Sequence, residues 1–365
     1  MHSPSESSSL IRREFIRLST GIISGMAVPG LMSRSVCAED VRAATATPIA
    51  ESFLSSGLNA LARAHHMSSM AGHLGASLIA GYFVGEQRPN LDPSVYEGIE
   101  GDLARVIRGE SVFGKKMSKK STLSDAELFE PFPKQKPDET LIDGIAEGLE
   151  KGIDKPRQSG HNVIFACLAI RALKQHPELA TPAIVDGIRR LMAMFANETP
   201  GSGYYGAKRG RIHGNKITLP EDDGTPAYND IDSMVIAVLD EAIELTPEVH
   251  RSGYGGLVHV INHAAAIVDL ADCGYDELAQ RAIQSHRHHL RLWRNLPNVA
   301  DEKGPTQVSK FTPHVAEYWK SGSVPYDRAL LTHRVKTMFG FDELAAAVDN
   351  QAKEKAAYEK LRYLM

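Results

Sequence analysis

Residues 72–84 read GHLGASLIAGYFV, and two later stretches have the same character: HNVIFACLAI over 161–170 and HVINHAAAIV over 259–268. Each would be apolar on nearly every side of a helix, so each is expected to be buried all round. Other segments carry one apolar stripe opposite charged residues, which is typical of surface helices: 94–109, 182–197 and 276–293. Inner and outer helices thus alternate along the chain, as they do in stacked helical hairpins.

No extended strand-like alternation appears, so the sequence predicts an all-α fold. We expect helices near 51–64, 69–84, 94–109, 138–152, 159–175, 182–197, 230–245, 255–273, 276–293, 326–339 and 342–362. The alternation of inner and outer helices favours an α/α barrel (toroid) or a curved helical array. The histidines at the start of the three buried stretches share no spacing of 20 to 50 residues, which disfavours a short-repeat scaffold.

The composition excludes several classes of protein. Of the 365 residues 42% are hydrophobic and 24% charged, which is typical of a globular chain and not of a disordered one. The net charge of −4 gives no general attraction for nucleic acid, which requires a basic surface. Beyond the N-terminal segment only Cys167 and Cys273 remain, both in apolar helical stretches, and we expect buried thiols more than a disulfide.

The N-terminal segment looks like a twin-arginine export signal. Arg12 and Arg13 precede a short apolar run that glycine and proline interrupt, and small residues around Ala38 suit signal cleavage. We expect residues 1–38 to be the signal and 39–365 a single helical domain. The run is too short for a stable membrane span, so the expected destination is the periplasm or the exterior. Many proteins exported in this way carry a cofactor, which the resemblance implies without naming one.

Histidines stand where the buried helices begin. Gly72-His73, Gly160-His161 and Gly255 to His259 each place an imidazole in or beside a first helical turn, where the helix dipole lowers its pKa. If the inner helices run parallel, these histidines converge at one mouth, and His73 and His161 become candidate catalytic residues. The alternative is that each histidine only bonds to a neighbouring loop.

Two further groupings suggest a metal ion. His259 and His263 lie four residues apart on one helix face, and His65-His66 precede His73 by about two turns. These four histidines are our candidate ligands for a divalent metal. The run 286–289 also holds three histidines, but on an amphipathic helix we expect a solvated surface cluster.

A long polar connection at 198–230 is the other informative region. Loops of this length in compact domains are usually functional, and we interpret it as a lid or rim over the pocket mouth. Arg209 and Arg211 can hold an anionic group there. Three of its side chains can transfer protons: Tyr204, Tyr205 and His213. The alternative is a solvated loop with paired charges.

Three functional hypotheses follow. The first is an exported enzyme of unassigned reaction with a histidine-lined pocket for a small molecule, assisted by a divalent metal ion. The second is a carbohydrate lyase or hydrolase on the same toroid with a saccharide ligand, which the two tryptophans, Trp293 and Trp319, support poorly. The third is a non-catalytic helical scaffold that binds a partner protein. The sequence does not decide the oligomeric state.

Overall fold

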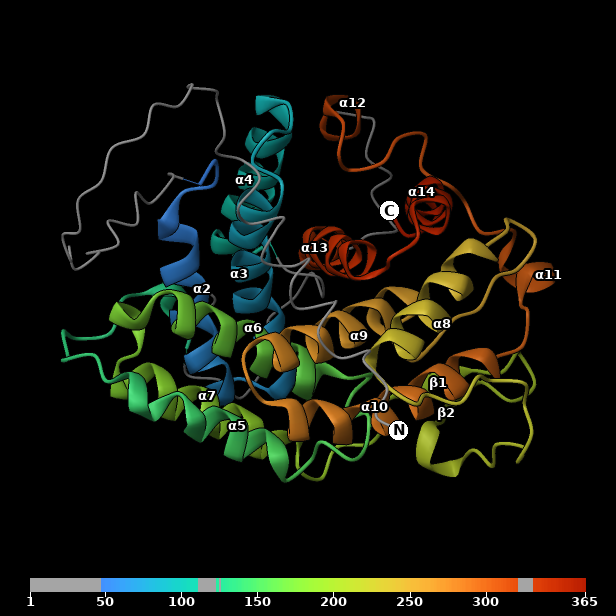
Figure 1. The fold of residues 1–365 in the computed structure, drawn as a ribbon, viewed down its shortest axis with the longest axis horizontal. Helices are drawn as coiled ribbons and strands as arrows, with labels where there is room; N and C mark the ends of the chain where they lie inside the picture. Colours follow the sequence, from blue (N-terminus) through green and yellow to red (C-terminus); the bar gives the residue numbers. More distant parts are fainter. Residues whose placement is uncertain (1–46, 111–122, 125, 321–330) are drawn as a thin grey trace, which may run out of the picture. The chain divides into compact units, whose positions relative to one another are not determined.

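The computed structural model describes residues 47–110, 123–124, 126–320 and 331–365. The described residues belong to one compact unit, and the expected export signal, residues 1–38, lies outside them. The described part is predominantly helical, which confirms the all-α prediction (Figure 1). The helices are α2 (Glu51–Arg63), α3 (Gly72–Gln87), α4 (Pro93–Ile107), α5 (Asp143–Glu150), α6 (His161–Gln175), α7 (Pro182–Phe195), α8 (Ile231–Ile243), α9 (Leu257–Asp272), α10 (Asp276–Arg294), α11 (Ala300–Lys303), α12 (Ala316–Trp319), α13 (Leu331–Ala347) and α14 (Gln351–Lys360).

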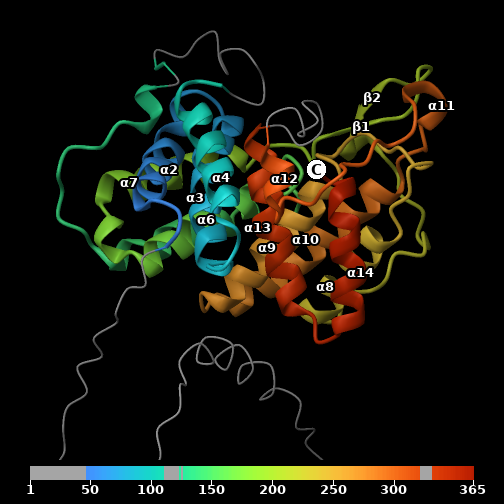
Figure 2. The ribbon, with the colours of Figure 1, turned by 90° about the horizontal axis from the view of Figure 1, so that it is seen from above.

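Four buried helices form a closed ring of neighbours. Helix α3 packs against α6, α6 against α9, α9 against α13, and α13 back against α3 (Figure 2). Nearly every residue of α3, α6 and α9 is buried, as their apolar composition predicts. These are the three stretches from which the fold class was predicted. The fourth member, α13, is equally buried although it is rich in polar residues.

The remaining long helices cover this ring. Helix α2 packs on α3, and α7 and α5 follow it outward. On the other side α10 and α8 pack on α9, and α14 packs on α8. Helices α4, α7 and α10 each bury one stripe and expose the other, as expected for surface helices.

Two details differ from the sequence prediction. The expected break between helices near residue 340 is wrong, because α13 continues to Ala347. Gly340 lies inside it, where a Cβ atom would come 2.4 Å from Asn262 Oδ1 of α9, so the glycine permits close helix packing and does not end the helix. The polar connection 198–230 contains an antiparallel hairpin of β1 (Ser202–Tyr204) and β2 (Arg211–His213).

Buried ion pairs hold the polar helix α13 in the ring. Arg334 Nε lies 2.8 Å from Asp102 Oδ2 of α4, and both side chains are buried. Arg171 of α6 bridges Asp269 of α9, at 2.8 Å, and Glu343 of α13. Such pairs stabilise weakly in themselves, but they fix which faces meet, since an unpaired buried charge is costly.

Two sequence expectations can be compared with the described part of the chain. No helix in it is long and apolar enough to cross a bilayer. Cys167 is buried and Cys273 is partly buried, and both are free thiols.

Candidate functional site

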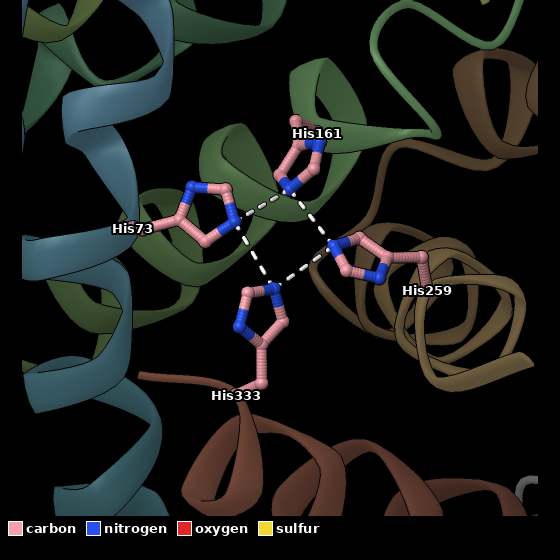
Figure 3. Close-up of side chains that lie close together, drawn as sticks. All are labelled: His73, His161, His259 and His333. Carbon is pink, nitrogen blue, oxygen red and sulfur yellow. Dashed lines mark hydrogen bonds between the residues drawn. The ribbon is translucent and has the colours of Figure 1, made fainter. Parts of the chain in front are cut away.

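Four imidazole rings meet where the four inner helices begin. His73, His161, His259 and His333 lie in the first turns of α3, α6, α9 and α13, and all four are buried. Around the group the Nε2–Nε2 distances are 2.9 Å, 3.1 Å, 3.1 Å and 3.2 Å, starting from the His73–His161 pair. Figure 3 shows them as a closed four-sided figure, which we call the histidine square (Figure 3).

Local sequence directs these rings toward one point. Gly160, with φ of +84°, forms the N-cap of α6, and Gly256, with φ of +76°, forms that of α9. Glycine adopts such backbone angles without the strain that a Cβ atom brings. Helix α3 instead continues from the short 3-10 helix Ser69–Ala71, whose N-cap Ser68 accepts a hydrogen bond from the Ala71 amide. Helices α6 and α9 thus begin abruptly at glycine, and the buried imidazole of each lies in its first turn.

The outer ring nitrogens fix the tautomers of three members. His73 Nδ1 lies 2.9 Å from the carbonyl of Met70, and His259 Nδ1 lies 2.5 Å from that of Gly255. His161 Nδ1 makes the same kind of contact with the Gln158 carbonyl. A carbonyl oxygen only accepts hydrogen bonds, so each of these Nδ1 atoms must carry the proton.

Lone pairs therefore face one another inside the square. A neutral imidazole protonated at Nδ1 has no proton on Nε2, so His73, His161 and His259 cannot hydrogen bond to each other there. Burial lowers the pKa of His73 and His161 well below the usual range and that of His259 to about 3, which removes the charged form. Converging lone pairs repel unless a cation lies between them. Orientation of the outer nitrogen by a carbonyl is also the usual arrangement of metal-bound histidine.

The geometry of the square suits a transition metal. Adjacent ring centroids are 4.4–4.8 Å apart, whereas His73 and His259, on a diagonal, are 6.2 Å apart. A regular tetrahedron would make these separations equal, so the arrangement is flattened. A flat square of side about 3 Å has its centre about 2.2 Å from each corner, close to the roughly 2.0–2.1 Å of metal–imidazole bonds. Square-planar nitrogen ligation is typical of Cu²⁺ and Ni²⁺.

One face of the square opens on a cavity of about 570 Å³, to which all four histidines contribute. The described lining also includes Ser202, Arg211, Arg251 and Ser252. The volume falls within the range of small-molecule sites. A ligand there would have direct access to anything bound between the imidazoles.

The other face of the square is closed by the protein interior. Lys336 lies one turn after His333, and its Nζ is 5.8 Å from the Phe165 ring, one turn after His161. Burial lowers the pKa of this lysine to about 7. Its side chain is buried, with 2% of the residue exposed.

The candidate site residues predicted in the polar connection 198–230 lie in different environments, and not all of them reach the cavity. Arg209 and Arg211 are both exposed, but Arg211 lines the cavity, whereas Arg209 stacks on Tyr205, with 5.0 Å between its Cζ and the ring centroid. Tyr204 donates a hydrogen bond to Glu302, and Tyr205 is buried with its hydroxyl 3.2 Å from that of Tyr254. His213 is exposed, and its Nδ1 lies 3.4 Å from Thr199 Oγ1. The structure thus brings only Arg211 of this set to the cavity.

The candidate metal ligands are also divided. His259 belongs to the square, but His65 and His66 stack on each other at 3.9 Å between centroids, away from it. His263 belongs to a second group, where its Nδ1 lies 3.3 Å from His289 Nδ1. In the described structure, the four candidate metal ligands therefore lie in three different places and do not form one metal site.

The expectation of a solvated surface cluster at 286–289 is wrong for the two histidines of this run that belong to the second group. His286 and His289 are fully buried. Their Nε2 atoms donate hydrogen bonds to the carbonyls of Val260 and Tyr254, at 2.9 Å each, so these polar atoms are satisfied in the interior. Burial lowers the pKa of His286 to about 3 and that of His289 to about 4. The amphipathic pattern was correct, but these two rings lie on its inward face.

Sequence reasoning missed His333. No Gly-His pair or apolar run marks it, because its helix carries Thr332, Arg334 and Lys336 beside it. His333 reaches the square only because this polar helix is buried, and the sequence pattern does not predict that burial.

Comparison of the chain with models of protein families, with curated proteins and with solved structures finds no match.

Proposed function

We propose that this chain is a metal-dependent enzyme in which the histidine square binds one divalent transition metal ion, with Cu²⁺ favoured. The observation that carries this proposal is the convergence of four Nε2 atoms at 2.9–3.2 Å, three of which carry lone pairs directed at one another. Imidazole nitrogens suit copper and nickel, and Cu²⁺ stands highest in the general affinity order. A metal ion would replace lone-pair repulsion by four coordinate bonds.

An enzyme requires an open coordination position, and the cavity supports one. Four ligands near one plane would leave the axial positions free, and all four histidines line the cavity of about 570 Å³. A substrate atom or a water molecule bound there would be polarised by the metal. A structural site would instead be closed by its protein ligands.

The competing hypotheses have less support. Within the described residues the cavity is lined by no Trp, Tyr or Phe side chain that could stack on a sugar ring. The scaffold hypothesis expects scattered histidines rather than a cluster. We further propose, as parts of the same hypothesis, that the four-helix ring is the inner layer of an α/α barrel and that the chain is exported by the twin-arginine route.

Metal titration of the purified full-length protein tests the proposal. After treatment with a chelator, we expect one Cu²⁺ per chain, with nitrogen hyperfine splitting from several imidazoles in the electron paramagnetic resonance spectrum. Azide added to the copper protein should shift its absorption spectrum, because an axial position is open. The control is the double variant His161→Ala/His259→Ala. Equal copper binding by wild type and this variant would refute the metal site, and copper that resists azide would refute the open position.

Two adjacent glycines provide a second, matched test. Gly255 and Gly256 both have positive φ, +74° and +76°, so alanine at either position strains the backbone, and with ψ of 174° Gly256 lies in a region that only glycine commonly adopts. A Cβ atom at 255 would lie 2.3 Å from His259 Cγ, whereas at 256 the nearest atom is at 4.0 Å. We expect Gly255→Ala to weaken copper affinity at least about 10-fold, as loss of ligand orientation does, with Gly256→Ala close to wild type.

The measurements are copper titration and the free energy of unfolding of both variants. The expected pattern is that both variants lose stability and that only Gly255→Ala also loses copper affinity. If both variants bind copper as the wild type does, His259 is not a ligand.

A further inference from the structure

The cavity above the histidine square is lined by positive groups in an acidic protein. The charged side chains among its described lining residues, histidines aside, are Arg211 and Arg251, and no Asp or Glu is among them. The whole chain carries a net charge of −4, so this local excess of positive charge is not a general property of the surface. Charge of one sign around a cleft attracts ligands of the other sign.

Both guanidinium groups keep unused hydrogen-bond donors. Arg211 Nη1 makes only long contacts, at 3.4 Å to the Ser202 carbonyl and 3.5 Å to Ser202 Oγ. Arg251 Nη1 lies 3.6 Å from Glu241 Oε1, beyond a good hydrogen bond. Arg251 Nε is buried and has no partner in the described part of the chain. Such a nitrogen normally finds an acceptor, and a ligand oxygen in the cavity can supply one.

The backbone adds to the same field. Helices α6 and α9 begin at the cavity, where Ser159 and Gly256 line it together with the first-turn histidines. Helix N-termini carry partial positive charge and favour anions. The proposed metal would contribute two further positive charges beside them.

We propose that the substrate of this site carries an oxyanion group, carboxylate or phosphate, which Arg211 and Arg251 bind while the reacting part of the molecule faces the metal. This assignment rests on the proposed function for the role of the metal, whereas the two arginines bind the anion in their own right. Guanidinium groups bind planar carboxylate and phosphate oxygens with paired hydrogen bonds. The arginines thus set specificity and position, and the metal acts on the other end of the substrate.

Anion binding to the full-length protein tests this proposal, with and without copper. The probes are inorganic phosphate, malonate and the neutral analogue malonamide, each measured by isothermal titration calorimetry at low ionic strength. We expect phosphate or malonate to bind and malonamide not to bind. Arg211→Gln and Arg251→Gln should each weaken that binding about 10- to 100-fold, the usual effect of losing one charge-assisted contact. The matched control is Arg209→Gln, since Arg209 lies in the same hairpin but outside the cavity.

The results separate this inference from the proposed function. Arginine-dependent anion binding in a protein that takes up no copper would support the oxyanion site and refute the metal. Copper binding with no anion binding, or with anion affinity equal in Arg211→Gln, Arg251→Gln and wild type, would refute the oxyanion site and leave the metal in place. Binding of malonamide as tightly as malonate would also refute it. Arg251→Lys, which keeps the charge, should retain more affinity than Arg251→Gln.

Discussion

Replacing His161 with alanine should weaken copper binding by more than about 100-fold, because this is a direct ligand and even outer residues that orient ligands cost 10- to 100-fold. His161 Nε2 contacts both neighbours in the square, at 2.9 Å and 3.1 Å. Its loss opens the ring and leaves three imidazoles, too few for square-planar coordination. The wild-type protein should gain about 4 kcal/mol of stability at copper concentrations 1,000 times the dissociation constant. At those same concentrations His161→Ala should gain much less.

The measurement is thermal unfolding of metal-free and copper-loaded protein, together with direct titration. His213→Ala is the control, since His213 is exposed on the hairpin and outside the cavity lining. It should retain the full copper-dependent rise in melting temperature. His161→Asn provides a polar replacement in case the alanine variant folds poorly. If copper stabilises His161→Ala as much as wild type, the square is not the binding site.

When the pH is lowered, the metal-free protein should unfold at a pH well above the range in which carboxylates titrate. Burial holds the pKa of His259 and His286 at about 3 and that of His289 at about 4, against about 6.5 in the unfolded chain. Between these values the unfolded state binds more protons than the folded state, so the free energy of unfolding falls as the pH falls. Each such histidine contributes about 1.4 kcal/mol per pH unit in this window. Three together remove a typical stability of 5–15 kcal/mol within a few pH units below 6.5.

Urea unfolding at pH 7.5, 6.5, 5.5 and 4.5, in the presence of a chelator, measures this dependence. Stability should drop steeply below pH 6, whereas above pH 7 buried Lys336, whose pKa is about 7, should give a smaller slope of the same sign. His286→Gln can still donate to the Val260 carbonyl and removes one titrating ring, so its slope should be lower by about 1.4 kcal/mol per pH unit. The exposed His213→Gln should leave the slope unchanged. A stability that stays constant from pH 7 to pH 5 would show that the histidines are not buried in the neutral form.

Much of the site was accessible from three short sequence patterns. His73, His161 and His259 each follow glycine-containing entries into apolar helices, and in the structure the imidazoles of these first turns meet. The prediction worked because burial on all sides forces these helices into one core. Spacing along a single helix was a poor guide: His259 and His263 lie four residues apart, yet their rings belong to different groups.

Local periodicity and residue polarity were enough to predict the helical fold class, the three apolar members of the inner ring and the histidines that begin them. Tertiary structure decided the rest. Helix α13 is polar in sequence and buried in the fold, because Asp102 and Arg171 from other helices meet the charges in or beside it. His333 reaches the square only through that packing, and Arg211 rather than Arg209 reaches the cavity through the hairpin register. Compensation of buried charge by distant residues leaves no local periodic signal, which is why the fourth histidine could not be read from its own neighbourhood.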